Sequence, residues 1–147
     1  VYVSICFISR TMIQRIQTLW LLLASICAFA SVKLPFYFGS IEIPGPTITI
    51  TPYDNFMLLV FVIATALMGL VTIFLFSNRS LQIKMCIVGL VLSLANLMHY
   101  FLYMKNFKTG GLSLYSILSF LVPVFFILAI RSIYKDQKLL KSLDRLR

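Results

Sequence analysis

Four long apolar segments, each free of charged residues, constrain this chain more than any other feature. Each has about 17 to 21 residues, and they cover residues 16–32, 56–76, 85–104 and 112–130. A helix rises about 1.5 Å per residue, so about 20 residues cross the roughly 30 Å hydrocarbon core of a bilayer. Because backbone polar groups in lipid need internal hydrogen bonds, each segment is expected to be a helix. The prediction is an all-α membrane protein built as a four-transmembrane-helix bundle.

The composition agrees with this prediction and argues against a soluble domain. Of the 147 residues, 61% are hydrophobic and 12% are charged, whereas soluble domains have about 45–50% apolar and about 25% charged residues. A soluble fold this small has too little interior to bury so much apolar side chain. No polar linker divides the chain, so a single membrane domain over residues 1–147 is expected.

The distribution of basic residues predicts the orientation in the membrane. Counted on alternate sides of the four segments, ten Lys and Arg residues share one side and three share the other. The ten are Arg10, Arg15, Arg79, Lys84, Arg131, Lys135, Lys138, Lys141, Arg145 and Arg147, and the three are Lys33, Lys105 and Lys108. The positive-inside rule then places both termini in the cytoplasm. The net charge of +9 is explained in this way, so no nucleic-acid partner is expected, and membrane lipids are the expected surroundings.

The first segment has an alternative interpretation as a cleavable signal peptide. Ala28-Phe29-Ala30 has the small-residue form of a cleavage site. The length of the apolar run and the three further segments favour a retained helix.

The region from residue 33 to residue 55 is predicted to form a small extracytoplasmic β-hairpin. Phe36–Phe38 and Ile41–Ile43 suggest one strand, and the alternating run Thr47–Thr51 suggests another. Pro44-Gly45-Pro46 between them is a turn signal. Such a hairpin is marginal alone, so it is expected to rest on the helix ends.

The basic C-terminal segment, residues 131–147, is predicted to lie in the cytoplasm. Leucines fall near one helical face at three- and four-residue steps, with basic residues beside them. One interpretation is an amphipathic helix that binds anionic lipid or a protein partner. The other is a solvated continuation of the fourth helix. The candidate lipid- or partner-binding residues are Lys138, Lys141, Arg145 and Arg147.

A stripe of small and polar residues on the third segment is the strongest candidate site. Gly89, Ser93, Asn96 and Tyr100 follow one another at steps of four, three and four, which puts them on one helical face. A small-x-x-x-small pair lets helices approach closely, and Asn can hydrogen-bond to a neighbouring helix. The stripe is interpreted as helix-packing residues, with a polar lining for a small ligand as the alternative.

No catalytic set, cofactor site or metal site is predicted. His99 is the one histidine, and Cys6, Cys27 and Cys86 show no paired spacing. Zinc needs about four close ligands, and two-histidine haem ligation would need a second chain. None of the four segments contains an acidic residue, which argues against proton- or cation-coupled transport.

Three short motifs give the chain a resemblance to a known family. They are Met12–Leu19, Asn78–Lys84 and Lys141–Arg147. Together they resemble the DUF4293-like family of uncharacterised four-span bacterial membrane proteins found in the Bacteroidota. The resemblance extends from Met12 to Arg147 and implies a bacterial inner membrane, but it implies no activity. Residues 1–11 depart from the pattern, which raises the alternative that translation starts at Met12.

The function expected from these features is that of a multi-pass inner-membrane protein. A non-enzymatic scaffold or accessory subunit, in a membrane protein complex or a homo-oligomer, is the first hypothesis. A small channel or transporter lined by the third segment is the second. A lipid-acting enzyme that joins His99 to Asp54 or Glu42 is the third, and it requires a pocket that brings these residues together.

Overall fold

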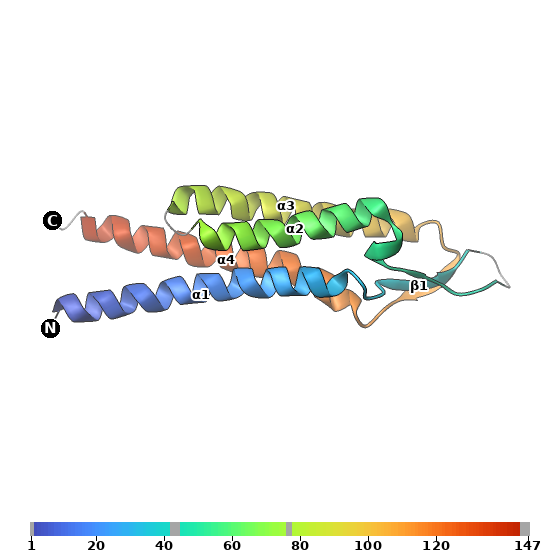
Figure 1. Cartoon of the computed structure of the whole chain (residues 1–147), viewed down its shortest axis with the longest axis horizontal. Coiled ribbons are helices and arrows are strands. Elements are labelled where there is room, and N and C mark those ends of the chain that lie inside the picture. The colour runs from blue at the N-terminus through green and yellow to red at the C-terminus, as the bar shows by residue number, and fades with distance from the viewer. Residues whose placement is uncertain (1, 42–44, 76–77, 145–147) are drawn as a thin grey trace.

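Four long helices form most of the computed structural model, which describes the backbone of residues 2–41, 45–75 and 78–144, and the side chains of these ranges except 2–15 and 139–144. The helices are α1 (Tyr2–Ser31), α2 (Phe56–Phe74), α3 (Arg79–Met104) and α4 (Ser116–Asp144). They lie side by side along the long axis (Figure 1). Helix α1 packs on α2 and α4, and α3 packs on the same two helices, so the four form a ring around a common interior.

The predicted helical segments agree with these helices, with one exception. Helix α2 begins at the predicted residue, Phe56, where the side chain of Asn55 accepts a hydrogen bond of 3.1 Å from the Met57 amide and so caps the helix. Helix α3 ends at the predicted Met104. The fourth segment is different, because Leu112 ends a strand and α4 begins only at Ser116.

A small sheet covers one end of the bundle, and it has three strands instead of the predicted two. Its strands are β1 (Tyr37–Ser40), β2 (Ile48–Ile50) and β3 (Thr109–Leu112), in the order β2-β1-β3. Both pairs are antiparallel, with Tyr37 opposite Ile50 on one side and opposite Leu112 on the other. The prediction of a hairpin between α1 and α2 was therefore incomplete, since the α3–α4 connection supplies the third strand.

The predicted strand positions are close to those observed. Strand β2 lies inside the predicted run Thr47–Thr51, while β1 ends at Ser40. The predicted continuation through Ile41 has no strand at that residue, and Glu42, Ile43 and Pro44 lie outside the described residues.

The sheet rests on the helix ends through a buried apolar cluster. This cluster contains Phe36, Tyr37 and Ile50 from the sheet region together with Leu58 of α2 and Leu97 and Tyr100 of α3. The ring of Phe36 stacks on that of Tyr100 with centroids 3.9 Å apart. Burial of these rings orders the short strands, which would be marginal without such support.

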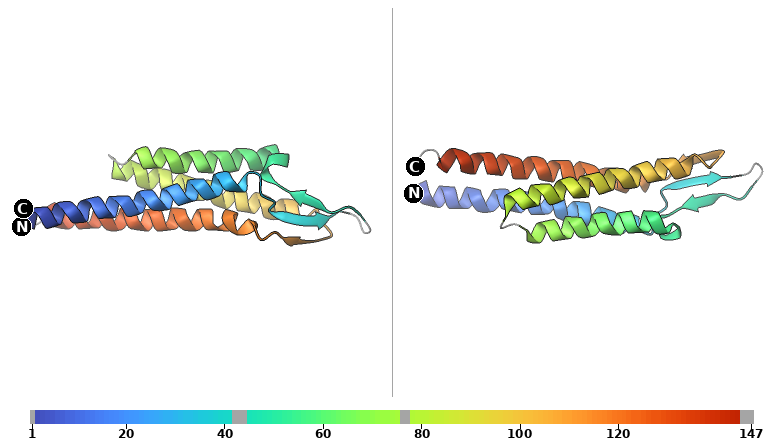
Figure 2. Two further views of the ribbon diagram at one scale, coloured as in Figure 1. Left: turned by 60° about the horizontal axis from the view of Figure 1, so that its bottom comes forward. Right: turned by 90° about the horizontal axis from the view of Figure 1, so that it is seen from above.

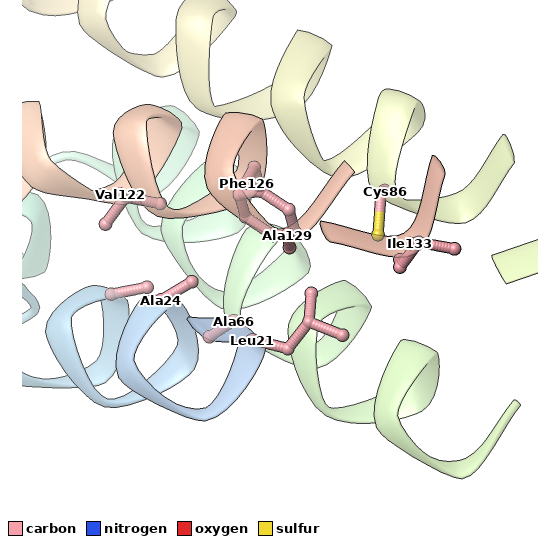
Figure 3. Packing of buried hydrophobic residues seen from close by; sticks show 9 residues of the cluster. Leu21, Ala24, Ala66, Cys86, Val122, Phe126, Ala129 and Ile133 are labelled. Atoms are coloured by element: carbon pink, nitrogen blue, oxygen red, sulfur yellow. The ribbon is translucent and has the colours of Figure 1, made fainter. Parts of the chain in front are cut away.

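A second cluster fills the middle of the bundle. This apolar layer consists of Leu21, Ala24, Ala28, Ala66, Cys86, Val122, Phe126, Ala129 and Ile133. Figure 3 shows Leu21 and Ala24 of α1 facing Phe126 and Ala129 of α4 across the interior. Many of its members are alanines, so the helix backbones approach closely.

The outward faces of all four helices are also apolar. Exposed residues include Leu19 and Ile26 of α1, Leu67 of α2, Val91 of α3 and Ile127 of α4. Among the described residues, three helical stretches are long and apolar enough to cross a membrane, and they are Phe56–Phe74, Arg79–Met104 and Ser116–Lys138. The apolar stretch Ile16–Ser31 of α1 is shorter.

Both ends of the chain lie at the end of the bundle opposite the sheet (Figure 1). Helices α1 and α4 run past the α2–α3 connection there, as both views in Figure 2 show. Helix α4 is continuous through Asp144, so the first part of the C-terminal segment continues the fourth helix.

Candidate functional site

The predicted stripe on α3 faces the interior of the bundle. Gly89, Ser93, Asn96 and Tyr100 are all buried. At Gly89 a Cβ atom would lie 2.6 Å from Cε1 of Phe126, so the glycine allows the phenyl ring of α4 to pack directly on the α3 backbone.

Two members of the stripe line a small cavity to which all four helices contribute. The cavity has a volume of about 10 Å³. It is lined by Ala28 and Ser31 of α1, Val62 and Thr65 of α2, Ser93 and Asn96 of α3, and Ser119 and Val122 of α4. A volume of this size holds a single water molecule, so the cavity is too small for an organic ligand.

Three of the four hydroxyl groups around this cavity donate to their own helices. Ser31 donates to the carbonyl oxygen of Ala28 at 2.8 Å, and Ser93 donates to that of Leu90 at 2.8 Å. Thr65 donates to the carbonyl oxygen of Phe61 at 2.7 Å. Their hydrogen atoms are therefore used within the helices, and their oxygen atoms remain available as acceptors.

Two buried polar atoms of the stripe have no hydrogen-bond partner among the described residues. They are Oδ1 of Asn96 and the hydroxyl oxygen of Tyr100, the latter with the Ser119 side chain nearby. A buried polar group without a partner costs about 1–3 kcal/mol, so both atoms mark places where the interior is polar beyond what helix packing needs.

A second polar cluster, at the end of the bundle away from the sheet, was missed by the sequence analysis. Gln17 of α1 donates a hydrogen bond of 2.8 Å to Oδ2 of Asp136 on α4. Arg79 at the start of α3 forms an ion pair of 2.6 Å with the same oxygen. Asp136 is buried, although it lies in the segment for which a solvated continuation of the fourth helix was one of two interpretations. This ion-pair cluster joins three of the four helices.

A periodic signal for Asp136 is present in the sequence. The interior face of α4 carries Phe126, Ala129 and Ile133, and the next position at the same spacing is Asp136. The helical period therefore continues past Arg131, where the charge-free segment ends. Nothing comparable in the sequence identifies Gln17 and Arg79 as its partners.

The sheet end of the molecule does not join His99 to Asp54. A groove of about 620 Å³ lies between β2 and the end of α3, and Asp54, Tyr103 and Asn106 are among its lining residues, but His99 is not. The imidazole of His99 lies instead beside the ring of Phe61, with centroids 6.2 Å apart. Glu42 lies outside the described residues.

The described part of the chain contains no candidate metal site. Within that part no group of three or more His, Cys, Asp and Glu side chains is placed to hold a metal ion. Cys86 is buried in the apolar layer, and Cys27 is half-buried beside it.

Only some of the predicted lipid- or partner-binding residues lie in the described part of the chain. Lys138 is exposed on α4, and Lys141 lies in the same helix. The side chain of Lys141 and the whole of Arg145 and Arg147 lie outside the described residues.

The comparisons with known proteins identify a family but no characterised relative. No curated protein and no solved structure matches the chain. The sequence pattern of a domain of unknown function, DUF4293, matches residues 13–146, which is nearly the whole chain. The resemblance seen in the three short motifs is thereby confirmed, and the chain belongs to the DUF4293 family.

Proposed function

We propose that this protein is a four-span inner-membrane scaffold or accessory subunit without enzymatic activity. The observation that carries the proposal is the apolar layer in the middle of the bundle. It lies between the ion-pair cluster at one end and the polar cavity at the other.

On each of three helices, residues of the apolar layer lie between the ion-pair cluster and the polar cavity. On α1 the layer residues Leu21 and Ala24 come between Gln17 and Ser31. On α3 Cys86 comes between Arg79 and Ser93. On α4 Phe126, Ala129 and Ile133 come between Ser119 and Asp136. An interior of this kind supports packing against lipid and partners better than it supports transport.

The outward surface supports four spans instead of three. Leu19, Leu22 and Ile26 are exposed on α1 at helical spacing, as are the apolar residues of the other three helices. Large exposed apolar surfaces need lipid or another protein to cover them. The apolar stretch of α1 has about 16 residues and would cover about 24 Å, but the helix itself continues to Tyr2 and packs along α4.

The orientation proposed is that both termini and the α2–α3 connection are cytoplasmic. They lie toward the same end of the bundle (Figure 1), and the excess of Lys and Arg belongs to that end. The sheet would then lie on the outer side of the membrane.

A small channel or transporter remains the second candidate, and the polar cavity beside Ser93 and Asn96 favours it. The two candidates differ in whether water reaches the interior. In a variant whose cysteines are replaced by alanine, Ser93→Cys would report this through reaction with a membrane-impermeant thiol reagent, and Thr47→Cys on the exposed sheet region is the matched control.

The scaffold proposal expects Thr47→Cys to react and Ser93→Cys to remain unmodified in proteoliposomes. Rapid modification of Ser93→Cys would contradict it and favour a conducting path. Purification in a mild detergent followed by mass spectrometry should then recover the protein with a fixed set of membrane partners or copies of itself. A monomer without partners would contradict the accessory role.

A further inference from the structure

The oxygen of the Asn96 side chain lacks a hydrogen-bond donor among the described residues, which points to a small bound ligand that donates to it. Asn96 is 8% exposed and lines the cavity between the four helices. Its Oδ1 atom has no hydrogen-bond partner among the described residues. An acceptor of this kind in a low-dielectric interior is costly unless a donor reaches it.

The four hydroxyl-bearing side chains of the cavity wall, Ser31, Thr65, Ser93 and Ser119, do not provide that donor in this structure, since Oδ1 has no hydrogen-bond partner among the described residues. The hydroxyl hydrogens of Ser31, Thr65 and Ser93 are engaged with the carbonyl oxygens of Ala28, Phe61 and Leu90. These three hydroxyls therefore present oxygen lone pairs toward the cavity, as Asn96 does. The ligand that fits is a donor of at least two hydrogen bonds.

The size of the cavity restricts the ligand further. A volume of about 10 Å³ is at the lower limit for one water molecule. The lining residues include no carboxylate, so a cation there would be desolvated without a compensating charge. A purely apolar void is also a poor description, because the wall includes four hydroxyl-bearing side chains, three of which donate their hydrogens to their own helices.

We propose that this cavity binds one water molecule, which donates hydrogen bonds to Oδ1 of Asn96 and to a hydroxyl oxygen of another helix. Buried waters of this kind make about three hydrogen bonds and are costly to remove. Ser31, Thr65 and Asn96 belong to α1, α2 and α3. The two hydroxyls bond within their own helices and the Asn96 oxygen has no partner among the described residues, so the water joins helices that these three side chains do not link directly. The site does not depend on the scaffold role.

Nuclear magnetic resonance detects such a water directly. The side-chain amide protons of Asn96 are assigned by their loss in Asn96→Leu, or in Asn96→Asp if the leucine variant does not fold. In the ¹⁵N-labelled full chain in nanodiscs, these protons should show a dipolar contact to a water whose residence exceeds the tumbling time. Asn106, which is exposed at the outer end of α3, is the control and should show only rapidly exchanging solvent.

The alternative occupants give different results. No long-lived water contact at Asn96 would overturn the proposal. A cation would raise the melting temperature in a saturable way in sodium chloride compared with choline chloride at equal ionic strength, and that result would also overturn it. The proposal expects the long-lived contact together with equal melting temperatures in the two salts.

Discussion

The side-chain amide of Gln17 donates a hydrogen bond of 2.8 Å to the carboxylate of Asp136, although 119 residues separate the two along the chain. The same carboxylate oxygen accepts a hydrogen bond of 2.6 Å from Arg79. One aspartate therefore holds α1, α3 and α4 in a defined relative rotation at the end of the bundle away from the sheet.

Replacing this aspartate should destabilise the bundle. Asp136→Asn leaves Arg79 without its counter-charge in a largely buried place, so we expect a loss of roughly 1–3 kcal/mol, less than for a fully buried pair because Arg79 is partly exposed. Thermal unfolding in detergent measures the effect, with Arg131→Gln on the exposed face of α4 as the matched control.

The double variant tests whether the ion pair is the cause. Arg79→Gln should restore part of the stability lost in Asp136→Asn, because no charge then remains unpaired. Equal melting temperatures for Asp136→Asn and Arg131→Gln would show that the cluster does not stabilise the fold.

Gly89 should tolerate no side chain. The Cβ atom of Gly89→Ala would lie 2.6 Å from the Phe126 ring, so α3 and α4 must separate or the ring must leave its position. We expect a loss of about 1–3 kcal/mol, as for other overpacked cores. Gly69→Ala is the graded comparison, because its Cβ would meet Ser25 at 3.3 Å, and its effect should be smaller. A Gly89→Ala variant as stable as the parent would contradict the close packing of these helices.

Replacement by alanine should disrupt the sheet at one of two adjacent glycines of β3 and have no effect at the other. A Cβ at Gly110 would collide with the carbonyl oxygen of Phe38 in the paired strand, whereas a Cβ at Gly111 would meet nothing within 4 Å. Gly110→Ala should therefore disrupt the pairing of the sheet and speed proteolysis of the loops around it. Gly111→Ala should change neither the pairing nor the rate of proteolysis. Identical proteolysis of the two variants would argue against the third strand.

The helices were predictable from the sequence, whereas the third strand was not. Charge-free apolar runs identify helices because lipid leaves the backbone no other partner, and Phe56 and Met104 were correctly placed as helix ends. Thr109-Gly110-Gly111-Leu112 has one β-branched residue, no aromatic residue and two adjacent glycines, which is unlike a typical strand. The pairing of this strand is also non-local. The hydroxyl oxygens of Ser40 and Thr109 are 2.7 Å apart, although the two residues are 69 positions apart in the sequence.

The candidate site was predictable on one helix and not between helices. Spacing alone places Gly89, Ser93, Asn96 and Tyr100 on one face, and the structure buries all four. The residues opposite them, such as Phe126 and Ser119, depend on how α4 is rotated against α3. Asp136 was missed for the same reason. An aspartate that follows a charge-free run is expected to be solvated unless its partners on other helices are known.

The basic C-terminal residues should influence association but not membrane attachment. Replacing Lys138, Lys141, Arg145 and Arg147 with Gln leaves the apolar part of α4 intact, so the protein should remain in the membrane fraction. Each Lys or Arg near an anionic leaflet contributes about 1 kcal/mol, so binding of the solubilised protein to anionic vesicles at low salt should weaken. Unchanged binding would show that this segment is only a solvated helix end.

The accessibility of single cysteines on the two sides of the membrane tests the proposed membrane topology of α2, α3 and α4 most directly. In the variant without native cysteines, Thr47→Cys and Thr109→Cys lie at the sheet end, and Asn78→Cys and Lys138→Cys lie toward the other end, all four at exposed positions. In spheroplasts treated with a membrane-impermeant thiol reagent, the account predicts that the first two are modified and that the last two are modified only after the membrane is permeabilised. Modification of Asn78→Cys or Lys138→Cys in sealed spheroplasts, or protection of Thr47→Cys and Thr109→Cys, would contradict it.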